Sequence, residues 1–424
     1  MSPLKSLGAA AMAAFLLSSC GTPSASAPAK SSASGYRLYA VDMRREGAPI
    51  SVLDATTGKL QRTLPMGTPS PDWSRLYVLA HPQQKTTLQA LDTHSGGVVS
   101  QISFDGWFDL PAANMIGQTG GLSPNGQWLV MERFSQPGNT NFMLATTSFI
   151  QRPRLITLPG SFSFDAISND GRRLYLIESL APKRPGYQVR LYDIQAGALD
   201  PHIVVDKRET APMTGSRVSG IFDRQGHWQY SLYVNQGGGP FIHALNLEGN
   251  FAWCIDLPLG GTQPEQMMWS LSLNAGGTAL IAVNPTLGKA ARVDVSPDGP
   301  SNEISQNVIF TPVRPAPQAR GFFTDAFAKG IQIGSSALAG DGTTLVAVAD
   351  SGTIALQLPG LTPGRTLLTD EGVESVVLGD DGAVLFSSSW SSSALREIDP
   401  LSGTGLKTLY LNTTYLLYHA ERVR

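Results

Sequence analysis

Six residues at intervals along the chain have side chains suited to ligand binding, and each directly precedes a short apolar run typical of a β-strand. They are two carboxylates, one guanidinium, two amides and one thioether: Asp165, Glu374, Arg217, Gln118, Gln332 and Met268. If the fold arranges these strands around one axis, such groups could bind a polar molecule or a metal ion. The alternative is that these side chains are solvated or pair with one another.

An enzyme needs a tighter constellation, and the common catalytic motifs are absent from the sequence. It contains no G-x-S-x-G nucleophile elbow, no H-E-x-x-H zinc motif and no C-x-x-C-H haem motif. The one histidine–glutamate pair that suggests a lactonase-like site is His243 with Glu265. Three of Asp165, Arg217, Glu265, His243 and Glu374 in a single pocket would indicate an enzyme. The sequence predicts no specific catalytic residue, no metal site and no cofactor, and it favours a binding protein.

The strands that must position these residues are joined by two kinds of turn, which alternate. The first has Asp or Asn followed by Gly and then an apolar strand, as in 121–131 and 166–177. The second has a strand, an Asp and a polar turn that ends in Gly, as in 51–58 and 191–197. Asp and Asn begin a turn through a hydrogen bond to their own backbone, and Gly adopts the positive φ that completes it. The pattern predicts antiparallel hairpins with almost no helix.

Two such hairpins make a four-stranded sheet, and the unit recurs roughly every 40 to 65 residues, as propeller blades do. The pattern resembles that of YVTN-type and WD-repeat-like bacterial β-propellers from Tyr36 to about Leu411, although no Trp-Asp dipeptide ends the repeats. The resemblance implies an all-β propeller of four-stranded antiparallel blades at 36–424. Eight blades are favoured, with seven as the alternative. In the eight-bladed form, Tyr36–Val41 pairs with a strand near 415–420, which removes an open sheet edge.

Alternation along the strands predicts which side chains form the core. Because blades bury both faces of their sheets, apolar residues in the inner strands should be buried. The predicted core residues are Leu76, Val78, Leu129, Leu174, Leu176, Leu280, Leu345 and Leu385.

Three insertions, 104–119, 206–219 and 297–334, interrupt the repeat. Long loops often carry function, and aromatic side chains beside arginine suit contacts with sugars, peptides or proteins. The candidate contact residues are Trp107, Arg320, Phe322 and Phe323. The alternative, favoured for Phe322 and Phe323, is that the loops cover one end of the propeller and shield its core.

The first 19 residues have the order of a secretory signal. Lys5 precedes an apolar stretch from Leu7 to Leu17, which is shorter than the about 20 residues needed to span a bilayer. The four residues at 17–20, Leu-Ser-Ser-Cys, resemble the lipobox of bacterial lipoprotein precursors. That resemblance implies cleavage before Cys20 and a diacylglycerol thioether on its sulfur.

An ordinary signal peptide cleaved near Ala25 or Ala27 is the alternative. With lipidation, residues 20–35 are a lipidated cysteine and a flexible tether, because small polar residues dominate them. Gly21 stands where an aspartate would be the inner-membrane retention signal of Gram-negative lipoproteins. The expected location is therefore the outer side of the cell membrane or the outer membrane, with the lipid on Cys20 as the membrane contact.

Charge argues against nucleic acid as a partner. The chain has 31 basic and 33 acidic residues, a net charge of −2, and no basic stripe. The sequence predicts a lipid-anchored extracytoplasmic propeller that binds an envelope protein or a small polar ligand, or that acts as a scaffold. Two alternatives stay open: a lactonase-like or dehydrogenase-like propeller enzyme acting on a sugar-derived molecule, and an accessory subunit of an envelope assembly or secretion complex.

Overall fold

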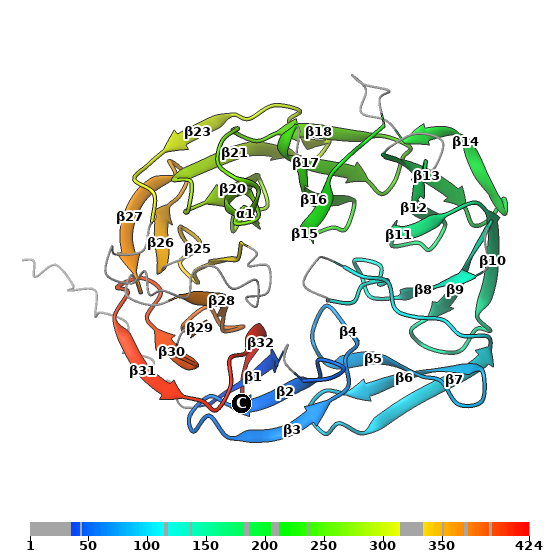
Figure 1. Ribbon diagram of the computed structural model, residues 1–424, viewed down its shortest axis with the longest axis horizontal. Helices are drawn as coiled ribbons and strands as arrows, with labels where there is room; N and C mark the ends of the chain where they lie inside the picture. The colour runs from blue at the N-terminus through cyan, green and yellow to red at the C-terminus, as the bar shows by residue number, and fades with distance from the viewer. Residues whose placement is uncertain are drawn as a thin grey trace, which may run out of the picture. The chain divides into compact units, whose positions relative to one another are not determined.

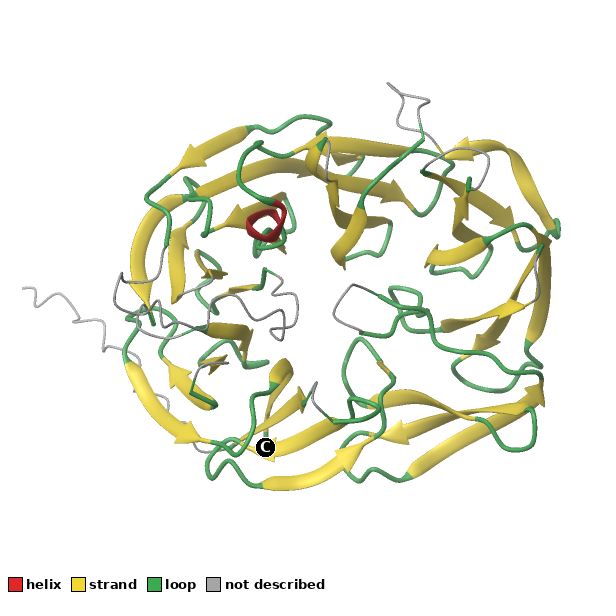
Figure 2. Ribbon diagram, in the orientation of Figure 1, coloured by secondary structure: helices red, strands yellow, loops and turns green. Residues whose placement is uncertain are grey.

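A computed structural model describes residues 35–42, 45–113, 118–135, 138–181, 186–204, 212–235, 238–313, 334–349, 352–368, 372–389 and 392–423. Within them the chain forms eight antiparallel sheets that follow one another around a ring (Figure 1). The helix α1 (Gln263–Gln266) is a single turn among many strands (Figure 2). The described residues form an eight-bladed β-propeller, which confirms the all-β prediction and the favoured number of blades.

The first four sheets use the N-terminal half of the chain and one strand from its C-terminal end. The first contains β1 (Tyr36–Val41), β2 (Ile50–Asp54), β3 (Leu60–Leu64) and β32 (Leu416–Arg422); the second contains β4 (Thr68–Pro69), β5 (Arg75–Ala80), β6 (Lys85–Asp92) and β7 (Val98–Asp105). The third contains β8 (Trp128–Ser135), β9 (Asn139–Thr146) and β10 (Arg154–Pro159); the fourth contains β11 (Phe162–Ile167), β12 (Arg173–Ser179), β13 (Tyr187–Asp193) and β14 (Ala198–Val204).

The other four sheets follow in chain order. The fifth contains β15 (Ser216–Phe222), β16 (Trp228–Asn235), β17 (Gly239–Asn246) and β18 (Ala252–Asp256); the sixth contains β19 (Ser270–Leu273), β20 (Ala279–Asn284), β21 (Lys289–Ser296), β22 (Gly299–Pro300) and β23 (Gln306–Ile309). The seventh contains β24 (Ser336–Leu338), β25 (Thr344–Ala349), β26 (Gly352–Gln357) and β27 (Thr362–Leu367); the eighth contains β28 (Val373–Leu378), β29 (Leu385–Ser389), β30 (Ala394–Ile398) and β31 (Gly405–Tyr410).

The ring closes by pairing the two ends of the propeller, as the sequence predicts. Strand β32 lies beside β1 in an antiparallel register that opposes Leu38 to Ala420 and Val41 to Leu416 (Figure 1). This pairing hydrogen-bonds the edge of β1 that would otherwise be open.

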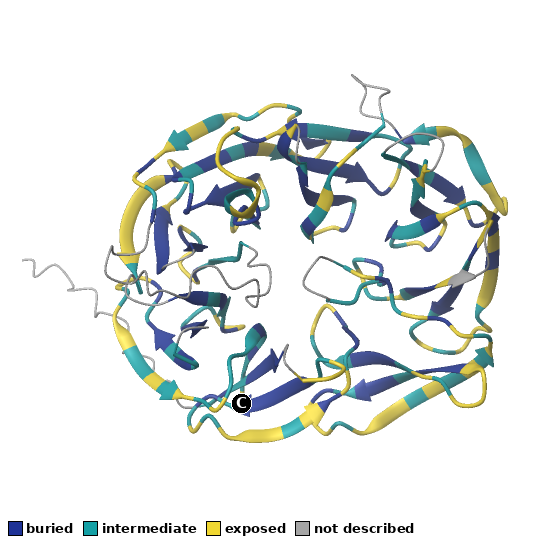
Figure 3. Cartoon of the chain, in the orientation of Figure 1, coloured by how far each residue is buried: buried dark blue, intermediate teal, exposed yellow. Residues whose placement is uncertain are grey.

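Apolar side chains fill the boundaries between neighbouring sheets. All eight predicted core residues are buried, each at most 3% exposed. Burial follows the position of the strand in its sheet, with exposed residues concentrated on the outermost strands (Figure 3). Burying a large aliphatic side chain contributes about 1.5–3 kcal/mol, so these clusters hold adjacent sheets together.

The turns show the predicted hydrogen bonds. The hydroxyl of Ser123 donates to Asn125 Oδ1 at 2.7 Å, and that oxygen accepts the amide of Gln127 at 3.1 Å. Gly126 closes the turn with φ of 71°. In the second kind of turn, Asp54 Oδ1 accepts the amide of Thr57 at 2.8 Å. The Asp/Asn-to-Gly pattern therefore specifies the hairpins.

Two sheets depart from the simple four-strand pattern. The third has three named strands, and an isolated bridge between Leu122 and Leu129 continues it inward. In the sixth, β23 pairs with β21, so residues 306–309 belong to the blade and not to the 297–334 insertion. Strand β23 shows no apolar run because it lies at the outer edge, where Asn307 and Ile309 are exposed.

Candidate functional site

A polar face on the fifth sheet makes its boundary with the fourth sheet unusual. Residues two apart on a strand share one face. On β16, every residue from 228 to 234 is buried, and the two faces differ: Trp228, Tyr230, Leu232 and Val234 pack in one apolar cluster, whereas Gln229, Ser231 and Tyr233 alternate with them. The second group faces the fourth sheet, because the amide of Gln229 donates to the carbonyl oxygen of Asp165 at 3.3 Å.

Asp165 and Arg217 form an ion pair across this boundary. Arg217 Nη1 lies 3.4 Å from Asp165 Oδ1, and the exposed fractions of the two side chains are 18% and 1%. Burial raises the pKa of Asp165, while the guanidinium of Arg217 acts to lower it. Gly220 makes room for the guanidinium: a Cβ on that residue would lie 2.5 Å from Arg217 Nη2.

The pair leaves several buried polar atoms at one place without a hydrogen-bond partner among the described residues. They are Asp165 Oδ2, Arg217 Nε, Gln229 Oε1 and the hydroxyl oxygens of Tyr187 and Tyr233. Each such group costs on the order of 1–3 kcal/mol when buried away from water. Native proteins satisfy nearly all buried polar atoms, so several unmatched atoms at one place are unusual in a folded protein.

The two tyrosines approach each other from different sheets. Tyr187 begins β13 and Tyr233 lies on β16, and their ring centroids are 6.0 Å apart. Burial raises the pKa of Tyr187, and electrostatic interactions with Tyr233 and with Asp165 raise it further. The two hydroxyls therefore interact with each other and, through space, with Asp165, and neither has a partner at normal hydrogen-bond geometry among the described residues.

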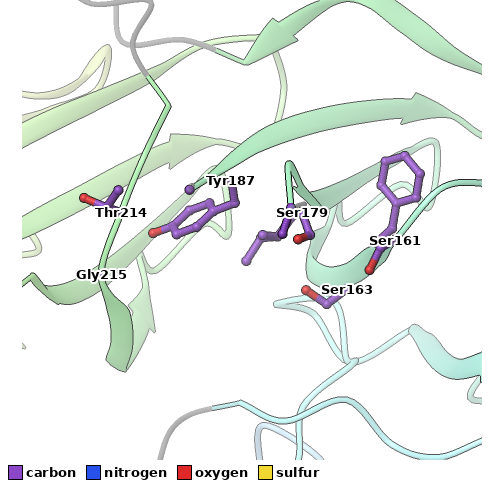
Figure 4. A pocket seen from close by; sticks show the side chains of 10 residues that line it. Ser161, Ser163, Ser179, Tyr187, Thr214 and Gly215 are labelled. Atoms are coloured by element: carbon purple, nitrogen blue, oxygen red, sulfur yellow. The ribbon is translucent and has the colours of Figure 1, made fainter. Parts of the chain in front are cut away.

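A cavity of about 640 Å³ adjoins this group of residues. It is lined by residues of the fourth sheet, of the loops beside it and of the segment just before the fifth sheet: Ser161, Phe162, Ser163, Ile177, Ser179, Ala181, Gly186, Tyr187, Thr214 and Gly215. Figure 4 shows the ring of Tyr187 between Ser179 and Thr214, with its hydroxyl on the side of Thr214 and Gly215. Tyr187 thus belongs both to the cavity lining and to the group of buried polar atoms.

The cavity and the ion pair lie close together along β11 and at the start of β15. Ser163 lines the cavity two residues before Asp165 on β11, and Gly215 lines it two residues before Arg217 on β15. We call this assembly the inter-blade site; it comprises the cavity together with Asp165, Arg217, Gln229, Tyr187 and Tyr233.

Asp165, Arg217 and Glu374 lie within the innermost strands of their sheets. The sequence pattern predicts these three residues just before the strands, and the structure corrects that position. The pairing register shifts between Phe164 and Ala166, leaving Asp165 as an extra residue in β11. Glu374 holds the equivalent position in β28, where the register shifts between Val373 and Ser375. A bulge breaks the regular alternation, so the first half of each strand resembles a loop in the sequence.

A second buried carboxyl group approaches β11 from the third sheet. Glu132 Oε2 on β8 accepts the amide of Phe164 at 3.0 Å. Burial raises the pKa of Glu132 to about 7. The sequence interpretation missed Glu132, as it missed Gln229, Tyr187 and Tyr233. The available signal was a polar residue inside an otherwise apolar inner strand.

Other candidate residues have different surroundings. Glu374 lies on β28, on the opposite side of the ring from β11 (Figure 1), and burial raises its pKa. Glu265 Oε2 accepts the amide and the hydroxyl of Thr262 at 2.7 and 2.9 Å, which fixes it at the start of α1. His243 is closer to the inter-blade site, since its ring packs edge-on against Tyr233 with centroids 6.1 Å apart.

Two further candidate residues, Met268 and Gln118, make contacts that stabilise the fold. Met268 is buried in an apolar cluster with Val346 and Val373. Gln118 accepts the amide of Ala113 through its backbone oxygen at 2.6 Å.

Of the four predicted loop contact residues, Trp107 is the one that lies within the described part of the chain. Its side chain is 53% exposed and stacks on His81 with ring centroids 4.2 Å apart. Arg320, Phe322, Phe323 and Gln332 lie outside the described residues, as does the lipidation candidate Cys20.

Among the residues that the structure describes, no helix is long and apolar enough to cross a bilayer. In the same residues, no three His, Cys, Asp or Glu side chains gather in a way that could hold a metal ion.

Comparison with known proteins supports the fold. No protein-family model and no curated protein matches the chain. Among solved structures, dihydro-heme d1 dehydrogenase NirN in complex with DHE is 14% identical with a TM-score of 0.52, and the match covers 91% of this chain and 75% of that one. Apo AztD from Citrobacter koseri is 11% identical with a TM-score of 0.51, with 91% and 97% covered. At such identities, the likeness shows the propeller fold alone.

Proposed function

We propose that this chain is a lipid-anchored β-propeller on the outer side of a bacterial membrane, where it binds a small polar molecule at the inter-blade site. The observation that carries the proposal is the group of buried polar atoms without protein partners beside a cavity. A ligand that supplies the missing hydrogen bonds gains free energy that the folded protein alone does not have.

The apolar boundary between the fifth and sixth sheets supports a role for Asp165 and Arg217 in binding instead of stability. The face of β16 opposite the polar one packs Tyr230, Leu232 and Val234 in an apolar cluster with the sixth sheet, so the same strand can form an apolar boundary. Replacing a buried ion pair by apolar residues is often neutral or stabilising. Apolar residues would therefore hold the fourth and fifth sheets together at least as well as Asp165 and Arg217 do. The ion pair is better suited to ligand recognition.

The size of the cavity is also suitable. Small-molecule sites in proteins measure roughly 300–1,000 Å³ and combine apolar walls with a few placed polar groups. At about 640 Å³, this cavity has both kinds of lining, with Ile177 and Ala181 beside the hydroxyls of Ser163 and Thr214.

The proposed membrane attachment rests on the sequence at 17–20. Replacing Cys20 by Ser should move the protein from the membrane fraction to the soluble fraction after cell lysis. The control is Cys254→Ser, which changes the chain's other cysteine and should leave the membrane fraction unchanged. Retention of the Cys20→Ser protein on membranes washed with high salt would contradict the anchor.

Binding can be tested with two matched tyrosine variants. Tyr233 and Tyr230 lie on the same strand, both hydroxyls are buried without partners, and they lie on opposite faces. Saturation-transfer NMR with a mixture of glucose, glucuronate, glucosamine, glycine and citrate should show binding to the wild type and to Tyr230→Phe. The signal should be weaker with Tyr233→Phe. Absence of binding by every probe, or equal signals for the three proteins, would overturn the binding function.

A further inference from the structure

We infer that the inter-blade site takes an uncharged polyhydroxylated molecule, such as a monosaccharide; this inference rests on the binding function proposed above. Three independent features of the site point to that chemistry: the balance of charge, the balance of hydrogen-bond donors and acceptors, and the composition of the cavity wall.

The charges at the site cancel. Asp165 and Arg217 are within 3.4 Å of each other, and both are largely shielded from water. A carboxylate ligand near Arg217 would also approach the carboxyl group of Asp165, and a cationic ligand near Asp165 would approach Arg217. Interactions between charges are strong where water is excluded, so a second ion would be repelled by one member of the pair. A neutral ligand avoids this repulsion.

The polar atoms without partners include both donors and acceptors. Asp165 Oδ2 and Gln229 Oε1 accept, Arg217 Nε donates, and the hydroxyls of Tyr187 and Tyr233 can do either. A carboxylate ligand only accepts and an ammonium ligand only donates, so neither can satisfy both kinds of atom. Each hydroxyl of a polyol both donates and accepts, and several such groups on one small molecule match this set.

The cavity wall also combines hydroxyl groups with apolar surface. Four of its lining residues carry hydroxyl groups on aliphatic side chains, namely Ser161, Ser163, Ser179 and Thr214. Ile177 and Ala181 supply apolar surface between them. A sugar ring has the same mixture of hydroxyl groups and apolar C–H surface.

Tyr187 controls access to the buried atoms. Its ring lines the cavity on one side and interacts with Asp165 and Tyr233 on the other. Its hydroxyl interacts with Tyr233 and has no partner at normal hydrogen-bond geometry among the described residues, so a ligand hydroxyl can replace this contact when the side chain turns toward solvent. The ligand's hydroxyls then reach Asp165 and Arg217, the second of which is already partly exposed.

The test is isothermal titration calorimetry on the purified full-length protein with neutral and charged sugars of matched shape. The neutral probes are glucose, galactose and N-acetylglucosamine, and the charged probes are glucuronate and glucosamine. At least one neutral probe should bind more tightly than both charged probes. Its affinity should fall at least tenfold in Tyr233→Phe and stay within twofold in Tyr230→Phe, the matched control on the other face of β16.

The possible failures can be told apart. If a charged probe binds most tightly and its affinity depends on Tyr233, the ligand class is wrong and the binding function stands. If none of the probes binds, or if Tyr233→Phe leaves every affinity unchanged, both the ligand class and the function are overturned. The tyrosine variants should fold normally, because each one loses a single hydroxyl without a partner at normal hydrogen-bond geometry among the described residues and keeps its buried ring.

Discussion

Glu397 should make the propeller less stable as the pH rises from weakly acidic to neutral. The residue lies on β30 with its side chain 1% exposed, and neither carboxylate oxygen has a hydrogen-bond partner among the described residues. Burial raises the pKa of Glu397 from its ordinary 4.5 to about 7, and Lys407 on the adjacent strand partly opposes the shift. The folded protein therefore holds a proton that the unfolded chain releases.

The sign and size of the effect follow from proton linkage. When a carboxyl group has a higher pKa in the folded state, stability is complete below the unfolded pKa and falls as the pH rises through the folded pKa. One pKa unit corresponds to about 1.4 kcal/mol, so a shift from 4.5 to about 7 represents on the order of 3 kcal/mol. Most of this loss should occur between about pH 5 and pH 7, with little change at higher pH.

Glu397→Gln removes the titration and keeps the size of the side chain. The measurement is the free energy of unfolding of the wild type and the variant by urea titration at half-unit steps from pH 4.5 to 8.5. The variant should gain on the wild type as the pH rises, by about 2–3 kcal/mol in total. The buried amide has the same cost at every pH, so the slope of the difference matters and its absolute value does not.

Glu303→Gln is the control, because Glu303 is exposed and the same substitution there changes no buried carboxyl group. A constant difference between wild type and Glu397→Gln from pH 4.5 to 8.5 would refute the reasoning. A difference that shrinks as the pH rises would also refute it, since the sign of the pKa shift would then be wrong.

Three further changes test other parts of the structure. Deleting residues 412–424 removes β32 and the buried Leu417 and Ala420, so the thermal unfolding midpoint should fall sharply in differential scanning calorimetry; an unchanged midpoint would disprove closure by the chain ends. In Gly220→Ala the new Cβ would lie 2.5 Å from Arg217 Nη2, so the guanidinium must shift from its present position and sugar affinity in calorimetry should fall, whereas full affinity would contradict a need for that position in binding. In Gly171→Ala the new Cβ would lie 2.1 Å from the Trp128 ring at a residue with φ of 68°, so urea unfolding should show a loss of about 1–3 kcal/mol, whereas wild-type stability would contradict that contact.

The fold was predictable from sequence because hairpin chemistry is local. An Asp or Asn followed closely by Gly specifies these turns, in some copies with a Ser before them, as Ser123, Asn125 and Gly126 show. Counting those turns, and matching Tyr36–Val41 with the C-terminal strand, predicted eight blades and the closure by β32. Apolar alternation in strands such as β5 and β12 was sufficient to predict the core residues.

The site was only partly predictable, because it depends on which faces meet. Asp165 and Arg217 were selected by residue type, but nothing in the sequence shows that they form a pair 3.4 Å apart across a sheet boundary. The polar row of β16 is visible as Gln229 and Tyr233 alternating with apolar residues. Whether such a row faces solvent, a neighbouring sheet or a cavity is decided by blade packing, which single-sequence patterns do not contain. The bulge at Asp165 also hid the start of β11.

The most direct measurement of the proposed binding is a crystal structure of the protein soaked with the neutral sugar that binds best in calorimetry. We expect density for the sugar in the cavity, with Tyr187 turned aside and a sugar hydroxyl within hydrogen-bond distance of Asp165 Oδ2. Sugar bound elsewhere on the propeller, or ordered water alone filling the bonds of Asp165, Gln229 and Tyr233, would contradict the assignment of this boundary as a binding site.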